Sequence, residues 1–370
     1  MNSTERLLAV LNGKMPDRVP ISTYELIGWN ARNFENRQPS YSSLMDFIRA
    51  RTDCIYMTGV HVPNKLDQPP EVEKWDEDEQ HVERLTLQTP TRRLVKIVSS
   101  SDNVMTTWTR TPWCGDLDDL WAMLSMPFEL GQPDYSALED AWADLQGTRG
   151  LPMIDLMDPL CEVAEKFEFG QFTVLAMTET QQIIKALDFL HERKVAKLER
   201  VLKGGGPVRS AMWRIVGPEY AAPPFLPPEL FSKLVVPYVS RYVEMIRQAG
   251  GYPRIHIHGR IGRLLNDILR MNPSAIDPVE PRPDGDADVG EVKAALGDQI
   301  CLMGGIELKH IESASEEFVA DLTRRTLAEG KDGGRFVIMP TAAPIDVPLS
   351  PQTERNYRVF IETALEAGRY

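Results

Sequence analysis

Cysteine is scarce in this sequence. The four cysteines, Cys54, Cys114, Cys161 and Cys301, are widely separated, and no two of them form a C-x-x-C pair. Zinc ribbons, dithiol redox centres and disulfide-rich scaffolds need cysteines that are closer together or more numerous. We therefore expect four free thiols and a fold that is stabilised by its apolar core.

Long apolar runs are also missing. No run approaches the roughly 20 residues of a transmembrane helix, and no hydrophobic signal core follows the polar opening MNSTER. We expect a soluble, cytoplasmic protein that does not associate with a membrane.

Positive charge is in the minority. The chain has 41 lysines and arginines against 54 acidic residues, a net charge of -13. A protein that binds phosphate backbones irrespective of sequence needs a basic surface. Nucleic acid is therefore not an expected partner.

Short apolar segments alternate with longer helical patterns along most of the 370 residues, which is typical of parallel β/α folds. Residues 61–115 are instead irregular, and we interpret them as an insertion. Within them, residues 82–87, 93–99 and 103–108 alternate like antiparallel strands. We predict a single (β/α)8 barrel domain over residues 1–370, with an N-terminal helix and this insertion after strand two. Its eight predicted strands are residues 19–24, 54–58, 151–156, 211–216, 254–258, 275–279, 300–304 and 335–339.

A doubly wound open sheet would use the same alternation of elements. The G-x-G-x-x-G motif that such a sheet often carries after its first strand is absent here. The glycines at 204–206 follow a helical pattern and precede a strand, whereas a phosphate loop follows a strand and opens a helix. The barrel is therefore the favoured prediction.

The active site of a barrel lies at the C-terminal ends of its strands. Polar residues gather at these ends, each on a different segment of the chain. They are Asp155, Asp158, Glu219, His256, His258, Asp277, Glu280, Glu307 and Thr341.

Two of the six histidines, His256 and His258, alternate on the fifth predicted strand. Residues i and i+2 of a strand face the same side, with Cα atoms roughly 6.6 Å apart, so both imidazoles can converge on one atom. Together with Glu219 and Glu280 on the flanking strands, they form a ligand set suited to Zn, Mn or Fe. Alternatively, the histidines are buried hydrogen-bonding residues and the carboxylates line a hydrated rim without a metal.

Several segments, in this order along the chain, resemble the uroporphyrinogen decarboxylase superfamily. This resemblance implies a single (β/α)8 barrel and a homodimer. The superfamily includes haem-pathway decarboxylases and zinc-dependent methyltransferases that work with corrinoid proteins. The segments are ERLLAVLNGKMPDRVP (5–20), GPEYAAPPFLPPELF (217–231), HIHG (256–259), DPVEP (277–281) with Gly285 and Asp286, and LMGGIE (302–307).

The sequence departs from the true decarboxylases at three places. Their R-Q-A-G-R-Y motif after the first strand is replaced by YELIGWNARNF (24–34). Their aspartate after the second strand is missing from MTGVH (57–61), and their histidine after the last strand is missing from PTAA (340–343). The comparison therefore argues against porphyrinogen decarboxylation.

The methyltransferase branch is more similar at the fifth strand. Its thiol-activating members hold zinc with H-x-C and a later cysteine, whereas this chain has His258 in place of the first cysteine and no second one at 341–343. Other corrinoid-linked members, which act on methyl ethers, hold zinc with glutamate and histidine, similar in kind to the set predicted here. The resemblance thus implies a divalent metal, Zn by analogy, and methyl transfer from a small methoxylated substrate.

The methyl acceptor implied by the resemblance is a corrinoid carried by a separate protein, because the chain has no D-x-H-x-x-G cobalamin signature. Arg260 is predicted to orient a substrate carboxylate, and Tyr220 to donate a proton. An exposed loop arginine and an aromatic lid are the alternatives for these two residues.

Two other functions stay open. One is a metal-free decarboxylase or lyase for a small acidic substrate, with Arg260, Arg282 and the acid Asp155 in its pocket. The other is a non-catalytic barrel that binds a small ligand.

Overall fold

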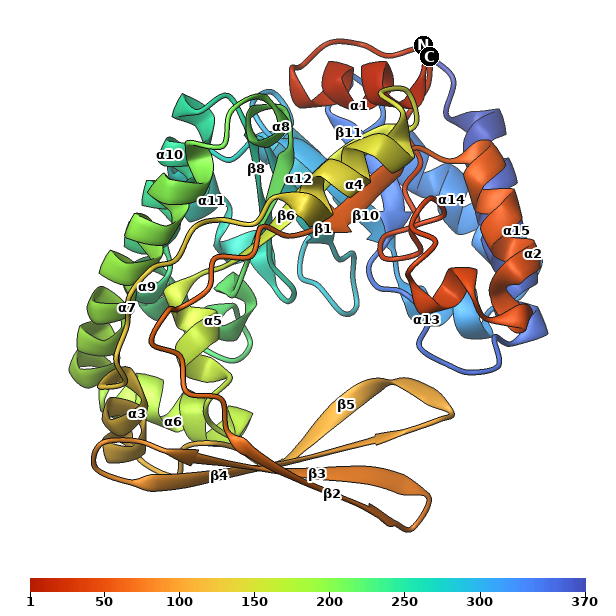
Figure 1. Cartoon of the computed structure of the whole chain (residues 1–370). Coiled ribbons are helices and arrows are strands. Elements are labelled where there is room, and N and C mark those ends of the chain that lie inside the picture. Colours follow the sequence, from red (N-terminus) through yellow and green to blue (C-terminus); the bar gives the residue numbers. More distant parts are fainter.

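A parallel sheet of seven strands forms the barrel wall (Figure 1). The computed structural model describes all 370 residues, except the side chain of Pro207. The strands lie side by side in chain order, as in a β/α barrel. They are β1 (Cys54–Thr58), β6 (Gly150–Met157), β7 (Met212–Val216), β8 (Tyr252–His256), β9 (Ala275–Val279), β10 (Cys301–Ile306) and β11 (Phe336–Pro340).

An irregular segment closes the barrel between β11 and β1. Ile21 forms a single parallel bridge with β11, and its carbonyl oxygen accepts a hydrogen bond of 2.7 Å from the amide of Asp53. Pro20 has no N–H to donate, and Tyr24 has a positive φ of 54°, so no longer ladder forms. The prediction of a regular strand here is wrong, yet the segment fills the eighth position and the predicted (β/α)8 class is confirmed.

Helices cover the outside of the sheet (Figure 1). In α10 the buried residues recur every three or four positions, so one apolar stripe packs on the sheet. The helices are α1 (Ser3–Leu11), α2 (Pro39–Arg51), α3 (Leu117–Leu124), α4 (Ser136–Leu145), α5 (Pro159–Ala164), α6 (Phe169–Thr178), α7 (Thr180–Leu202), α8 (Gly206–Arg209), α9 (Pro228–Leu234), α10 (Val236–Gln248), α11 (Leu265–Met271), α12 (Val289–Leu296), α13 (Leu308–Ser313), α14 (Glu316–Gly330) and α15 (Pro351–Ala367).

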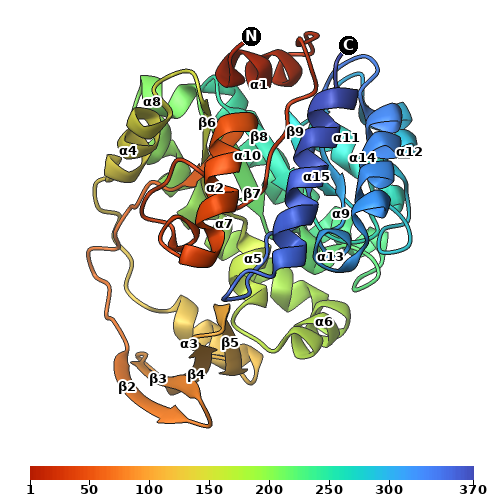
Figure 2. The same cartoon turned by 90° about the vertical axis from the view of Figure 1, so that its right-hand side faces the viewer.

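The two ends of the chain meet at the N-terminal face of the barrel. Helix α1 covers this face, where the hydroxyl of Thr4 donates a hydrogen bond of 2.8 Å to the carbonyl oxygen of Gly150 at the start of β6. Helix α15 runs beside α2 (Figure 2), and the guanidinium of Arg358 donates to the carbonyl oxygen of Ser43 at 3.0 Å. The opposite face, at the C-terminal ends of the strands, is therefore left for a site.

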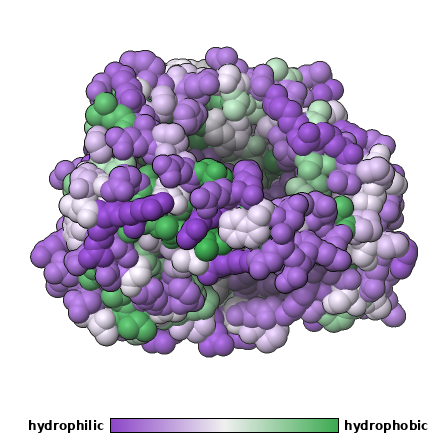
Figure 3. Space-filling model, turned by 60° about the horizontal axis from the view of Figure 1, so that its bottom comes forward, coloured by the Kyte–Doolittle hydropathy of each residue, from purple (hydrophilic) through white to green (hydrophobic). Residues whose placement is uncertain are grey.

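The predicted insertion is a separate antiparallel sheet of four strands at this opposite face. It leaves the barrel after β1 and returns to touch the loop after β11, where the amide of Met105 donates to the carbonyl oxygen of Ile345 at 2.8 Å. The surface near it is hollowed and mixes hydrophobic with hydrophilic side chains (Figure 3). The strands are β2 (Glu71–Glu77), β3 (Gln80–Gln88), β4 (Arg93–Ser101) and β5 (Val104–Thr111).

Three further sequence predictions are tested by the fold. Strand β8 ends at His256, so His258 lies in the following loop and not on the strand as predicted. All four cysteines are buried free thiols, which confirms that prediction. Within the described residues, no helix has both the length and the apolar character to span a bilayer.

Candidate functional site

Charged side chains enter the barrel interior from three neighbouring strands. Asp155 of β6, Arg214 of β7 and Arg254 of β8 are register partners, so they form one row on the same face of the sheet. This is also the face whose apolar residues, such as Met153 and Met212, form the interior cluster of the barrel. A charged side chain in this apolar interior must be paired with a side chain of opposite charge.

The pairing in the row is complete. Arg214 donates to both carboxylate oxygens of Asp155, at 2.8 and 3.1 Å. Arg254, which is 1% exposed, forms a two-bond ion pair with Asp277 on β9. Burial alone would raise the pKa of Asp277, but the charges of Arg254 and His256 hold it well below its usual range.

His256 extends this network towards the C-terminal end of the barrel. Its Nδ1 lies 2.9 Å from Oδ2 of Asp277, and its Nε2 lies 3.5 Å from the hydroxyl of Tyr24. The same hydroxyl is 3.3 Å from Nη1 of Arg214. The ring of His256 is therefore held by β9 and by the segment that closes the barrel, and Tyr24 links it to Arg214 of β7.

His258 has its own carboxylate partner. Its Nδ1 lies 2.8 Å from Oε1 of Glu280, and the other oxygen of Glu280 accepts a 2.7 Å hydrogen bond from the amide of Gly259. Burial alone would lower the pKa of His258, but the hydrogen bond to Glu280 and the charges of Glu280, Asp277 and Glu219 raise it. The ring of His258 is therefore held by a carboxylate in the same way as the ring of His256.

The two imidazoles lie together, as the sequence predicted. Their ring centroids are 4.7 Å apart, and their planes meet at 86°. Each ring uses Nδ1 for a carboxylate, which leaves Nε2 as the nitrogen that can act on a ligand. A histidine held by a carboxylate in this way is typical of metal sites and of acid–base catalysts.

The other predicted site residues are placed differently. Asp155 is engaged by Arg214, while Glu219 accepts a 2.9 Å hydrogen bond from the amide of Gly217. Tyr220 belongs to an aromatic cluster, with its ring centroid 5.9 Å from that of Phe169. Arg260 lines a cavity formed by the loops that follow β7, β8 and β9.

A metal centre needs more than the two imidazoles. Among the residues that the structure describes, no group of three or more His, Cys, Asp or Glu side chains is placed to hold a metal ion. Glu280 already uses both oxygens within the protein. The donors left for a metal in this arrangement are the Nε2 atoms of His256 and His258, and that of His256 faces the hydroxyl of Tyr24 at 3.5 Å.

Four residues of this network were not singled out by the sequence as functional. They are Tyr24, Arg214, Arg254 and the carboxylate partner Asp277, which was noted only as a polar strand end. Arg254 had a detectable signal, because it shares the alternation of His256 and His258 and so points to the same side of the strand. Tyr24 had none, because it reaches the site from the irregular segment.

Two buried carboxyl groups lie at strand ends without complete hydrogen bonding. Burial raises the pKa of Asp158 to about 8, and burial with the charges of Glu280 and Asp284 raises that of Glu307 to about 7. Within the described residues, Oδ2 of Asp158 and Oε1 of Glu307 have no hydrogen-bond partner. Both groups can therefore carry a proton near neutral pH.

We expect Glu307→Gln to stabilise the fold at alkaline pH. Because the native pKa is raised, the native state binds more protons than the unfolded one between about pH 4.3 and the native value, so stability falls as pH rises through this window. Glutamine removes this penalty, with a gain of about 1–3 kcal/mol at pH 8 that shrinks at pH 5. Urea unfolding at both pH values measures it.

Glu317 offers a matched control, because it is exposed on α14. Glu317→Gln should change the free energy of unfolding by less than about 0.5 kcal/mol at either pH. A gain for Glu307→Gln that is equal at pH 5 and pH 8 would contradict the assignment of the raised pKa.

Comparison with known proteins agrees with the fold. A model of the family Uroporphyrinogen decarboxylase (URO-D) matches residues 158–364, more than half of the chain, including the histidines. A search of curated proteins gave no significant match.

Among solved structures, a methyltransferase from Methanosarcina mazei shares 14% identity over 99% of both chains, with a TM-score of 0.60. A B12-independent methionine synthase from Shewanella sp. W3-18-1 shares 13% identity over 65% of this chain and 69% of its own, with a TM-score of 0.34, and supports no inference. The first likeness concerns the fold alone. The family match, however, covers more than half of the chain, including β7, β8 and β9 with both histidines, and the chain belongs to the uroporphyrinogen decarboxylase family.

Proposed function

We propose that this protein is a methyltransferase that takes a methyl group from a small methoxylated molecule and passes it to a corrinoid on a separate protein. The observation that carries the proposal is the pair of imidazoles at the C-terminal end of the barrel, each held on Nδ1 by its own carboxylate. Family membership and the fold shared with a methyltransferase support it.

The proposal includes a divalent metal, with Zn as the first candidate. His256 and His258 would hold it through Nε2, and Asp277 and Glu280 would orient the two rings. When bound, the metal would supply Lewis acidity for the oxygen from which the methyl group leaves. Of the predicted ligands, Glu280 already uses both oxygens within the protein, so ligation by Glu280 would exchange one of these hydrogen bonds for the metal. The hydrogen bond to Glu219 uses Oε2.

The chain's own residues supply orientation and protons. In the proposed reaction the bond between the methyl carbon and the oxygen breaks, the oxygen keeps the electron pair and gains a proton, and the methyl group goes to the corrinoid. Tyr220 remains our proposed proton donor, since its hydroxyl is protonated at neutral pH; burial raises its pKa and so makes it a weaker acid than an exposed tyrosine. Arg260 would orient an acidic group of the substrate.

The full chain, purified without chelator, should contain stoichiometric divalent metal and demethylate at least one of a panel of methoxylated compounds when reduced corrinoid protein is present. Elemental analysis and the spectrum of the methylated corrinoid measure the two results. A protein that contains no metal and shows no methyl transfer would contradict the proposal. Release of CO₂ from an acidic substrate by chelated protein would instead support a metal-free decarboxylase.

A further inference from the structure

A cavity of about 780 Å³ lies at the C-terminal end of the barrel, large enough for a small organic molecule. It is formed by the loops that follow β7, β8 and β9, together with Met177 of α6. These loops are on the same face as His256 and His258, and Arg260 in the wall is only two residues beyond His258. Its lining residues are Met177, Pro223, Pro224, Phe225, Leu226, Pro227, Pro228, Arg260, Arg263, Arg282, Pro283, Gly285 and Asp286.

Gly259 joins His258 directly to Arg260 in the cavity wall. Gly259 has a φ of 104°, and a Cβ atom there would lie 2.7 Å from the carbonyl oxygen of Pro223. The chain can turn sharply only because this residue lacks a side chain. Directly after the turn, the amide of Arg260 donates a 2.8 Å hydrogen bond to the same carbonyl oxygen, which joins the β7 and β8 loops.

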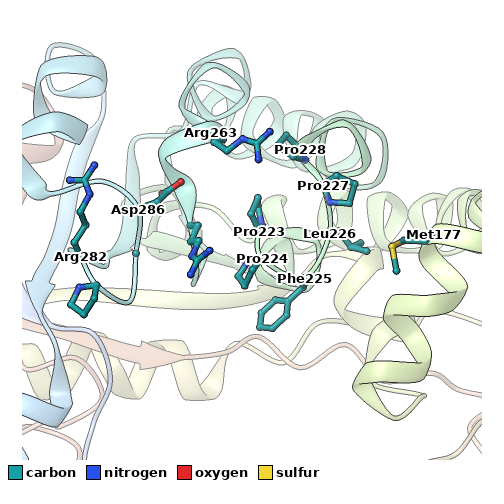
Figure 4. A pocket seen from close by; sticks show the side chains of 13 residues that line it. Met177, Pro223, Pro224, Phe225, Leu226, Pro227, Pro228, Arg263, Arg282 and Asp286 are labelled. Atoms are coloured by element: carbon teal, nitrogen blue, oxygen red, sulfur yellow. The ribbon is translucent and has the colours of Figure 1, made fainter.

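The cavity has two different walls. Pro223, Pro224, Phe225 and Leu226 follow one another on the β7 loop, and Arg263 lies across from them (Figure 4). Phe225 packs edge-on against Phe169, with ring centroids 4.6 Å apart, and is still 44% exposed. One wall is therefore apolar and aromatic, and the other carries three arginines together with one carboxylate, Asp286, whose Oδ1 accepts a hydrogen bond from the amide of Gly262.

The positive charge of the cavity is only partly neutralised. Arg282 pairs with Asp288 at 2.8 Å and also with Glu291. Over the described part of the chain, by contrast, the side chains of Arg260 and Arg263 have neither an ion pair nor a hydrogen bond to the protein. Two positive charges beside the cavity are therefore not neutralised by an ion pair, although the net charge of the chain is -13.

We propose that this cavity binds an amphipathic organic anion, with Arg260 and Arg263 on its carboxylate or phosphate and the Pro223–Leu226 wall on its apolar body. Guanidinium groups bind both oxyanions through paired hydrogen bonds. The inference rests on the proposed function in one respect, namely that this anion is the methyl donor. Its methoxy group would then extend past Gly259 towards His258.

Isothermal titration of the full chain with two probes tests the inference. The anion 4-methoxybenzoate should bind at least about 10-fold more tightly than the neutral 4-methoxybenzyl alcohol, and high salt should reduce the difference because it screens the charges. Equal affinity for the two probes, or no binding of the anion, would overturn the inference.

Substitution of single arginines tests which of them bind the anion. Arg260→Ala and Arg263→Ala should each weaken binding of 4-methoxybenzoate by about 10-fold or more, and Arg260→Lys by less, because lysine keeps the charge without the paired donors. Arg282→Ala is the matched control, because its guanidinium lines the same cavity but is already paired, and its effect should stay under about 2-fold. Equal losses for Arg282→Ala and Arg260→Ala would contradict the assignment.

The binding measurement needs neither metal nor corrinoid, so it separates the two proposals. His258→Ala should still bind 4-methoxybenzoate while it loses methyl transfer. If the wild-type chain binds the anion selectively but transfers no methyl group, the anion site stands and the proposed function fails.

Discussion

Asp277→Asn is expected to lower the free energy of unfolding by about 3–5 kcal/mol, because it leaves a buried cation without its counter-charge. Arg254 is 1% exposed and Asp277 is fully buried. Asparagine keeps the shape of the side chain, so the loss reports the missing charge and not a cavity. Since a typical domain is stable by only about 5–15 kcal/mol, urea unfolding should show the change clearly.

The same ion pair makes a second variant informative. In Arg254→Met with Asp277→Leu both charges are absent, and the double variant should recover most of the stability lost by Asp277→Asn. Asp298→Asn, on the surface, should change stability by less than about 0.5 kcal/mol. A double variant as unstable as Asp277→Asn alone would show that shape, not charge, determines the stability of this layer.

The loss of stability caused by Asp277→Asn should also depend on pH. The pKa of Asp277 is lowered in the native state, so its ionised form contributes stability above the unfolded value of about 3.9, and that contribution is lost as the pH falls below it. The difference between wild type and Asp277→Asn should therefore be smaller in acid than at pH 7.

Alanine in place of His256 or His258 is expected to lower methyl transfer by about 10²–10⁴-fold, because each ring presents the one nitrogen not used by a carboxylate. Glu280→Gln should have a smaller effect, about 10–100-fold, since it leaves the imidazole of His258 but loosens its orientation. Initial rates of corrinoid methylation and the metal content of each variant measure both effects.

His81 provides the control for this series. It lies exposed on β3 of the insertion, where it pairs with Asp76 and Asp102. His81→Ala should leave the rate within about 2-fold of wild type, as expected for a surface substitution away from the site. Full activity of His258→Ala with its normal fold, shown by circular dichroism, would remove this histidine from the mechanism.

The fold was predictable where the pattern is local. Strands β9 and β11 are fully buried and, apart from Asp277, apolar, and the sequence placed both of them within one residue. Strand β2 was not predicted, because every residue of it is exposed and its sequence EVEKWDE has no clear apolar alternation. It is a strand only because β3 offers a partner, which is a contact that the local sequence does not contain.

The part of the site that follows from a local pattern was also predictable. The alternation in RIHIHG brings His256 and His258 together, and the strand order puts acidic residues on both sides. The sequence could not say which acid meets which imidazole. Asp277 and Glu280 lie only three residues apart, and it is the register of β9 against β8 that assigns them to His256 and His258.

The sequence by itself determined the barrel class, the free thiols, the insertion and the paired histidines, because each follows from composition or from a period of a few residues. Tertiary structure decided the rest. It placed Tyr24 and Arg214 beside His256, paired Arg254 with Asp277, and left Arg260 and Arg263 without partners. These contacts join segments that are far apart in the chain, so they depend on how strands align and loops turn, which no local pattern specifies.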